Sequence, residues 1–154
     1  MADFFFDSSA IVKRCVNEFG SGYVEELVEP GNQNNVILAQ ITQVEVASAF
    51  ARRKRGKTLS DDDAALALKS FEVDLVDVYI TFEMSDEHIG SATDLATKHA
   101  LRGFDAVQLA TALAANYDLI DSGRNPLVFV SADSDLNLAA VANGLNVENP
   151  NDHK

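Results

Sequence analysis

The chain has 154 residues, of which 47% are hydrophobic, and its formal net charge is −12. This length predicts one domain, over residues 1–150, and the hydrophobic content excludes a disordered chain because it suffices for a packed core. No apolar stretch approaches the ~18 residues that a membrane-spanning helix requires, and the apolar run near the N-terminus is too short and too acidic for a secretory signal. We therefore expect a cytoplasmic protein without a membrane segment.

The cysteine and histidine content limits the kinds of metal site. Cys15 is the only cysteine, which excludes an internal disulfide and argues against a zinc site with cysteine ligands. The three histidines, His88, His99 and His153, show no metal-ligand spacing, and we assign them no role. These residues therefore predict neither a disulfide framework nor a zinc centre.

Short apolar runs and longer amphipathic segments alternate along the whole chain. The runs predict strands over residues 4–6, 36–40, 78–82, 127–130 and 145–147. The segments predict helices over residues 9–16, 21–28, 42–56, 61–75, 85–100, 105–117 and 135–143, and we expect Ser8 or Ser9 to cap the first of them. This alternation predicts an α/β domain of three layers, with a central, mainly parallel sheet of four to five strands and helices on both faces.

Four acidic residues stand where strands end or helices begin. Asp7 and Asp133 each follow a predicted strand, and Glu45 and Asp105 each lie in the first turn of a predicted helix. In an open α/β sheet these positions meet at one edge, where ligands bind. Four carboxylates at one crevice repel one another, and cations relieve that repulsion. Because all donors are oxygens, the pattern predicts a Mg²⁺ or Mn²⁺ site, with Asp135 as an alternative fourth ligand.

Each acid also has an interpretation that requires no ligand. Glu45 would complete a capping box with Thr42. Asp105 would favour the positive end of a helix dipole, and Asp7 and Asp133 would be ordinary turn or cap residues at strand ends. Spacing alone leaves these alternatives open.

The helix predicted over residues 42–56 carries an apolar stripe of Val44, Ala47 and Ala51 and ends in a basic turn. Five of the twelve basic residues of the chain lie there, at Arg52, Arg53, Lys54, Arg55 and Lys57. They have two interpretations, a solvated helix end that complements the dipole, or a patch that contacts the phosphates of a polyanion. The candidate phosphate contacts, which would be RNA contacts if the polyanion is RNA, are Arg52, Arg53 and Arg55, together with Lys13 and Arg14 after the first acid.

Four segments resemble, in order, the motifs of PIN domains of the VapC family. They are FFFDSSAIVK (4–13), TQVEVA (42–47), LRGFDAVQLATAL (101–113) and VSADSDL (130–136). The resemblance covers nearly the whole chain, and the third segment is the most specific. It implies a PIN-like fold and hydrolysis of phosphodiester bonds in RNA with Mg²⁺ or Mn²⁺.

The resemblance also implies roles for single residues and for partners. The metal-binding, catalytic carboxylates would be Asp7, Glu45, Asp105 and Asp133, with Ser8 or Ser9 as supporting polar groups. VapC proteins commonly form dimers, and a cognate VapB antitoxin inhibits them by laying a C-terminal segment over the acidic crevice. We therefore expect the toxin of a toxin–antitoxin pair, a homodimer whose partners are RNA and a VapB-like protein.

Other classes fit the sequence less well. A phosphotransferase of the haloacid dehalogenase type would carry a second acid where this chain has Ser9. A receiver domain needs an early acidic pair and a late lysine at the sheet edge, and neither is present. The serious alternative is a PIN fold that acts as a catalytically silent or housekeeping binding module without an antitoxin.

Overall fold

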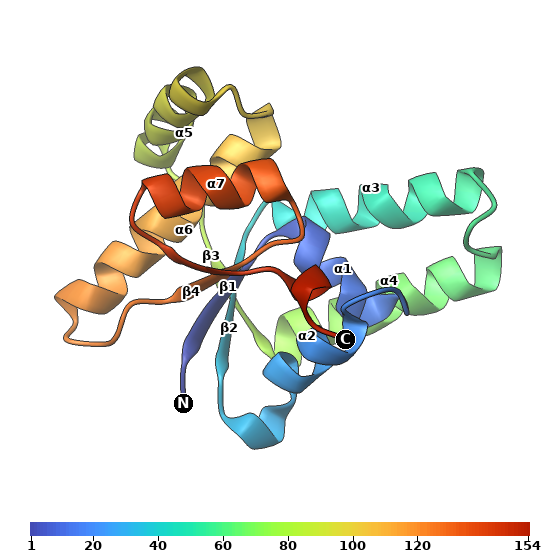
Figure 1. Cartoon of the computed structure of the whole chain (residues 1–154). Helices are drawn as coiled ribbons and strands as arrows, with labels where there is room; N and C mark the ends of the chain where they lie inside the picture. The colour runs from blue at the N-terminus through green and yellow to red at the C-terminus, as the bar shows by residue number, and fades with distance from the viewer.

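The computed structural model describes residues 1–154 and contains one central sheet of five strands (Figure 1). The strands are β1 (Asp3–Phe6), β2 (Asn35–Ala39), β3 (Tyr79–Phe82), β4 (Val128–Val130) and β5 (Asn146–Glu148). Their spatial order is β3-β2-β1-β4-β5, and every neighbouring pair is parallel. The predicted parallel sheet is confirmed, at the upper limit of the expected strand number.

The predicted helices are present with shifts of a few residues at their ends. They are α1 (Ser8–Cys15), α2 (Ser21–Val28), α3 (Thr42–Arg55), α4 (Asp61–Asp77), α5 (Asp86–His99), α6 (Gly103–Asp121) and α7 (Ser134–Ala142). Two short 3-10 helices, η1 (Pro30–Asn32) and η2 (Pro150–Asp152), complete the chain. None of the helices is long and apolar enough to cross a membrane.

The three central strands β1, β2 and β4 are buried on both faces, as expected for a parallel sheet covered by helices, whereas the edge strands β3 and β5 are partly exposed. Successive side chains of β1 point to opposite faces, so Phe5 and Phe6 enter two different hydrophobic clusters. Phe5 stacks on Phe129 of β4, with ring centroids 5.8 Å apart, in the cluster formed with α5, α6 and α7. Phe6 packs among α1, α2, α3 and α4. The three predicted layers are visible in Figure 1, with α5 to α7 on one side of the sheet and α1 to α4 on the other.

The parallel arrangement brings the carboxyl ends of β1 and β4 to the same edge of the sheet. Asp7 follows β1 directly, and its backbone N–H donates to the carbonyl of Val130, the last residue of β4, at 3.1 Å. The start of α1 is therefore fixed against the loop that leads into α7. This loop carries Asp133.

Local predictions for two helix starts were wrong. Asp7, not Ser8 or Ser9, caps α1, because its carboxylate accepts from the backbone N–H of Ala10 at 3.0 Å. The capping box of Thr42 and Glu45 does not form, since α3 begins after Ile41 without a side-chain cap.

The predicted apolar stripe of α3 was also wrong. Val46 and Phe50 form the buried face of this helix, whereas Val44 is 63% exposed. The helix is therefore rotated relative to the prediction. Glu45, one residue before the buried Val46, is half-buried at the edge of the packed face.

Candidate active site

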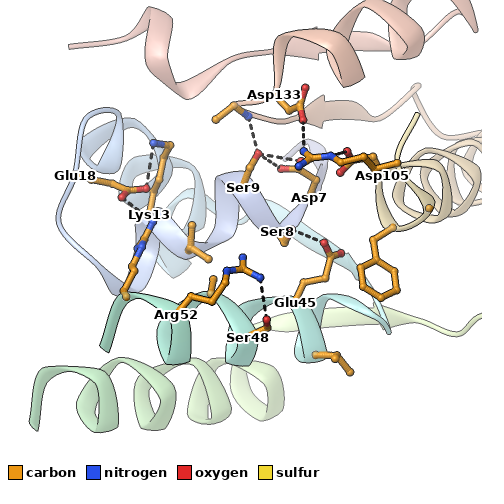
Figure 2. A pocket seen from close by; sticks show the side chains of 18 residues that line it. Asp7, Ser8, Ser9, Lys13, Glu18, Glu45, Ser48, Arg52, Asp105 and Asp133 are labelled. Carbon is orange, nitrogen blue, oxygen red and sulfur yellow. Dashed lines mark hydrogen bonds and ion pairs between the residues drawn. The ribbon is translucent and has the colours of Figure 1, made fainter. Parts of the chain in front are cut away.

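A cavity of about 700 Å³ opens where the carboxyl ends of β1 and β4 meet the first turns of α3 and α6. Its 18 lining residues include all four predicted acids, Asp7, Glu45, Asp105 and Asp133. Figure 2 shows these side chains gathered in one part of the cavity. Asp135, the alternative fourth ligand, does not line the cavity. The fold therefore brings together carboxylates that are far apart in the sequence.

Asp7 is the most buried of the four acids, with only 2% of its surface exposed. Ser9 Oγ donates to both carboxylate oxygens, at 2.7 and 2.9 Å, and Ser131 Oγ donates at 2.8 Å. Burial raises the pKa of Asp7 to about 7; the hydrogen bonds from Ser9, Ser131 and the backbone of Ala10 oppose this, while nearby Glu45 adds to it. The negative form of Asp7 is costly unless a cation is near.

Both serines that bind Asp7 are oriented by backbone groups of the β4–α7 loop. Ser9 Oγ accepts from the N–H of Ala132 at 2.9 Å, and Ser131 Oγ accepts from the N–H of Asp133 at 3.1 Å. The hydroxyl hydrogens therefore point at the carboxylate of Asp7. This part of the site is rigid because each donor is fixed by a second hydrogen bond.

Glu45 is positioned by two other helices. Ser8 Oγ of α1 donates to its Oε2 at 3.0 Å, and Gln108 Nε2 of α6 donates to its Oε1 at 2.7 Å. The fully buried Gln108 amide also donates to Thr42 Oγ1 at 2.8 Å. Thr42 thus serves as an anchor for Gln108, which explains why a polar residue lies in the interior there.

Asp105 and Asp133 share a cation from the chain itself. Arg102 Nε donates to Asp105 Oδ2 at 3.0 Å, and Arg102 Nη2 donates to Asp133 Oδ2 at 3.1 Å. The other oxygen of Asp133 accepts from the N–H groups of Asp135 and Leu136 and caps α7. Burial raises the pKa of Asp105, and the hydrogen bond and positive charge of Arg102 oppose that rise.

The donor chemistry of this cluster fits a hard divalent ion. The four acids provide only oxygen ligands, and no histidine or cysteine lines the cavity. The guanidinium of Arg102 already occupies the position of a cation between two of these acids. In their present rotamers, no three of the acids lie close enough together to hold one ion.

A second part of the cavity is basic, and only some of the candidate RNA contacts line it. Lys13, Arg52 and Arg53 line the cavity, whereas Arg14 and Arg55 do not. Lys13 pairs with Glu18 at 3.3 Å (Figure 2), and Arg53 pairs with the same carboxylate at 3.0 Å. Arg52 Nη1 donates to Ser48 Oγ at 3.0 Å and has no acidic partner. Arg14 instead pairs with Asp74 at 3.5 Å.

Sequence reasoning missed three residues of the site, Arg102, Gln108 and Ser131. Gln108 had a detectable signal, because it is a large polar residue three positions after Asp105 in a helix of mostly apolar residues. Ser131 and Arg102 had no signal beyond lying near an acid in the sequence. Apolar side chains were missed as well, since the exposed Val44 and Phe104 line the cavity beside the acids.

Comparison with known proteins identifies the family. The sequence matches the model of the PIN domain over residues 4–142. Ribonucleases VapC45 and VapC49 of Mycobacterium tuberculosis are each 34% identical to this chain over 110 residues, which is 71% of this chain and 74% of each relative. The chain therefore belongs to the PIN domain family and, within it, to the VapC group.

Solved structures show the same fold at low sequence identity. The crystal structure of VapBC2 from Rickettsia felis, bound to a DNA fragment from its promoter, superposes with a TM-score of 0.65. The match covers 96% of this chain and 98% of that chain at 14% identity. This similarity confirms the expected PIN-like fold.

Proposed function

We propose that this chain is a metal-dependent endoribonuclease that hydrolyses phosphodiester bonds in RNA with Mg²⁺ or Mn²⁺. The observation that carries this proposal is one cavity whose lining includes the four predicted acids and, beside them, the basic side chains of Lys13, Arg52 and Arg53. Carboxylates bind the ion, and basic side chains bind the phosphates of a polyanion. The names of the two relatives that are 34% identical, both ribonucleases, support RNA as the substrate.

The catalytic residues of the proposal are Asp7, Glu45, Asp105 and Asp133, which would hold the ion. A divalent ion bound there supplies Lewis-acid stabilisation of the phosphoryl oxygens and lowers the pKa of a water molecule. The chain's own contribution is to orient its carboxylates and keep them charged. Ser9 and Ser131 stabilise the charged form of Asp7, and Ser8 fixes Glu45.

The basic part of the cavity would position the RNA strand. Glu45 and Arg52 lie on the same side of α3, seven residues and thus about 10 Å apart along the helix. A phosphate that reacts near Glu45 therefore leaves a neighbouring phosphate within reach of Arg52. Lys13 and Arg53 strengthen the positive potential there, although Glu18 offsets part of it. Arg14 and Arg55 lie outside the cavity and take no part in this role.

We further propose that the protein is the toxin of a VapBC-type pair, a cytoplasmic homodimer inhibited by a VapB-like antitoxin. An acidic cavity is complementary to an arginine side chain, which pairs with two carboxylate oxygens at once. The VapBC2 complex provides the structural precedent in this fold. Asp105→Ala should therefore weaken both Mn²⁺ binding and the antitoxin complex in calorimetric titrations.

The decisive test is cleavage of an unstructured, fluorescently labelled RNA by the purified protein. We expect cleavage that requires Mg²⁺ or Mn²⁺ and falls more than about 100-fold in Glu45→Gln, since even outer partners of metal ligands cost 10- to 100-fold. Asp135→Asn is the matched control, because this carboxylate lies outside the cavity and should be dispensable. A wild-type protein that binds RNA but never cleaves it would favour the silent or housekeeping binding module.

A further inference from the structure

Arg102 differs from the other basic residues of the cavity in what it contacts. Four basic residues line the cavity, namely Lys13, Arg52, Arg53 and Arg102. Of these, only Arg102 makes ion pairs with the proposed metal ligands, at 3.0 Å to Asp105 and 3.1 Å to Asp133. Its side chain is nevertheless 81% exposed. A guanidinium thus lies between two carboxylates and remains free to leave toward solvent.

Arg102 occupies the one available oxygen of Asp133 and one of the two oxygens of Asp105. Asp133 uses Oδ1 to cap α7, which leaves Oδ2 as its available donor, and Arg102 Nη2 binds that oxygen. Arg102 Nε likewise occupies Oδ2 of Asp105. A divalent ion between these carboxylates would compete for the same lone pairs and would also be repelled by a guanidinium a few ångströms away.

The backbone allows this guanidinium to move without disturbing the fold. Arg102 precedes the first residue of α6 in extended conformation, with φ −62° and ψ 151°, and its side chain makes no capping hydrogen bond. Its exposed ion pairs are individually weak. Without a cation, however, Asp105 and Asp133 repel each other, which favours the paired position of Arg102.

We propose that Arg102 is the resident cation of the proposed metal site: its guanidinium neutralises Asp105 and Asp133 until a divalent ion displaces it. The inference rests on the proposed metal site. It adds that a side chain of the same protein competes with the ion for the carboxylates. The apparent metal affinity is then the intrinsic affinity reduced by the cost of releasing Arg102. Two exposed ion pairs correspond to a reduction of roughly two- to tenfold.

Metal binding in the absence of RNA tests the proposal without reference to activity. Mn²⁺ is titrated by calorimetry into wild type, Arg102→Gln and Arg52→Gln. Both variants lose one positive charge from the same cavity, but Arg52 contacts Ser48 and no acid. We expect the dissociation constant of Arg102→Gln to fall about two- to tenfold and that of Arg52→Gln to change less than about twofold.

The outcomes separate this inference from the metal site on which it rests. If wild type binds Mn²⁺ and Arg102→Gln binds it equally well or more weakly, the competition by Arg102 is overturned and the metal site is not. An equal gain in Mn²⁺ affinity in Arg52→Gln also overturns it, because the gain would then come from the loss of any positive charge in the cavity. No binding to any of the three proteins overturns the metal site as well.

A second measurement keeps the test valid if Arg102→Gln does not fold. In wild type, the Nε–H resonance of Arg102 is followed by NMR during titration with diamagnetic Mg²⁺. We expect it to move toward the position of a solvated guanidinium as Mg²⁺ saturates the site. A resonance that stays unchanged at saturation would show that the ion and Arg102 bind together, which overturns the displacement.

Discussion

The acidic and basic parts of the cavity are built in different ways. Asp7 and Glu45 receive hydrogen bonds from neutral donors of α1, α6 and the β4–α7 loop, which fix the carboxylates without cancelling their charge. In the basic part, Lys13 and Arg53 are paired with Glu18, and Arg52 reaches only a hydroxyl. The first arrangement suits a small ion with strict geometry. The second suits a flexible polyanion that is bound through charge.

This difference predicts that changes in the acidic part abolish chemistry, whereas changes in the basic part weaken binding in a salt-dependent manner. The largest effect should come from Asp7→Asn. We expect cleavage, measured with the labelled RNA, to fall more than about 100-fold, as for a direct metal ligand. Asparagine can still cap α1, so the stability of this helix should not decrease.

The stability of the same variant tests whether the charged carboxylate of Asp7 destabilises the folded protein in the absence of metal. Its pKa is raised from the ordinary 3.8 to about 7 in the folded protein. Below about pH 4 the group is protonated in both the folded and the unfolded state and has no effect. Between about pH 4 and 7 the unfolded chain releases the proton first, so the free energy of unfolding falls as pH rises.

Asp7→Asn removes this dependence, and in metal-free buffer its stability relative to wild type should increase across that window, by at most about 4 kcal/mol. Urea denaturation of both proteins at several pH values measures the difference. A variant that is less stable than wild type at about pH 8 without metal would show that the Asp7 carboxylate is a structural group.

The next largest effect should come from Gln108→Leu, which removes the amide that fixes Glu45 and bonds to Thr42. We expect Mn²⁺ affinity and cleavage to fall about 10- to 100-fold, the usual cost of losing an outer partner of a metal ligand. Thr111→Val is the matched control, because Thr111 is equally buried on α6 but bonds only to its own helix. Equal losses in both variants would indicate a general packing defect.

The adjacent serines of α1 offer a smaller and sharper comparison. Ser9 makes hydrogen bonds to both oxygens of Asp7 and to the N–H of Ala132, whereas Ser8 makes one to Glu45. Ser9→Ala should destabilise the metal-bound protein by about 1–3 kcal/mol, and Ser8→Ala by less than about 1 kcal/mol. Thermal unfolding with saturating Mg²⁺ measures both. The reverse order would mean that Glu45, not Asp7, is the better-organised ligand.

The smallest effect should appear in the basic part. Arg52→Gln should weaken RNA binding and reduce the slope of log affinity against log salt concentration by about 0.7, the value for one phosphate contact on a single strand. Arg55→Gln should leave that slope unchanged, since Arg55 does not line the cavity. Fluorescence anisotropy with labelled RNA measures both, in the background of Glu45→Gln, which we expect to be inactive. A slope that Arg52→Gln leaves unchanged would show that the basic cluster is only a solvated helix end, whereas an equal reduction in both variants would extend the phosphate contacts to Arg55.

The sequence alone determined the strands, the helices and the edge at which the acids meet. Apolar runs and amphipathic periods depend on local spacing, and parallel strands bring all their carboxyl ends to one edge whatever their packing details. The order of strands and acids along the chain therefore predicts that Asp7, Glu45, Asp105 and Asp133 meet at one edge, although spacing alone also allowed cap and turn roles. In the structure all four line one cavity.

Only the tertiary structure decided what contacts those acids. The donation of Gln108 to Glu45 depends on the packing of α6 against α3, and the bridge of Arg102 depends on the distance between the starts of α6 and α7. The pairing of Lys13 and Arg53 through Glu18 likewise joins α1 and α3 across a loop. Spacing within one segment carries no information on such contacts, because hydrogen bonds of about 3 Å are set by how rigid elements pack against one another.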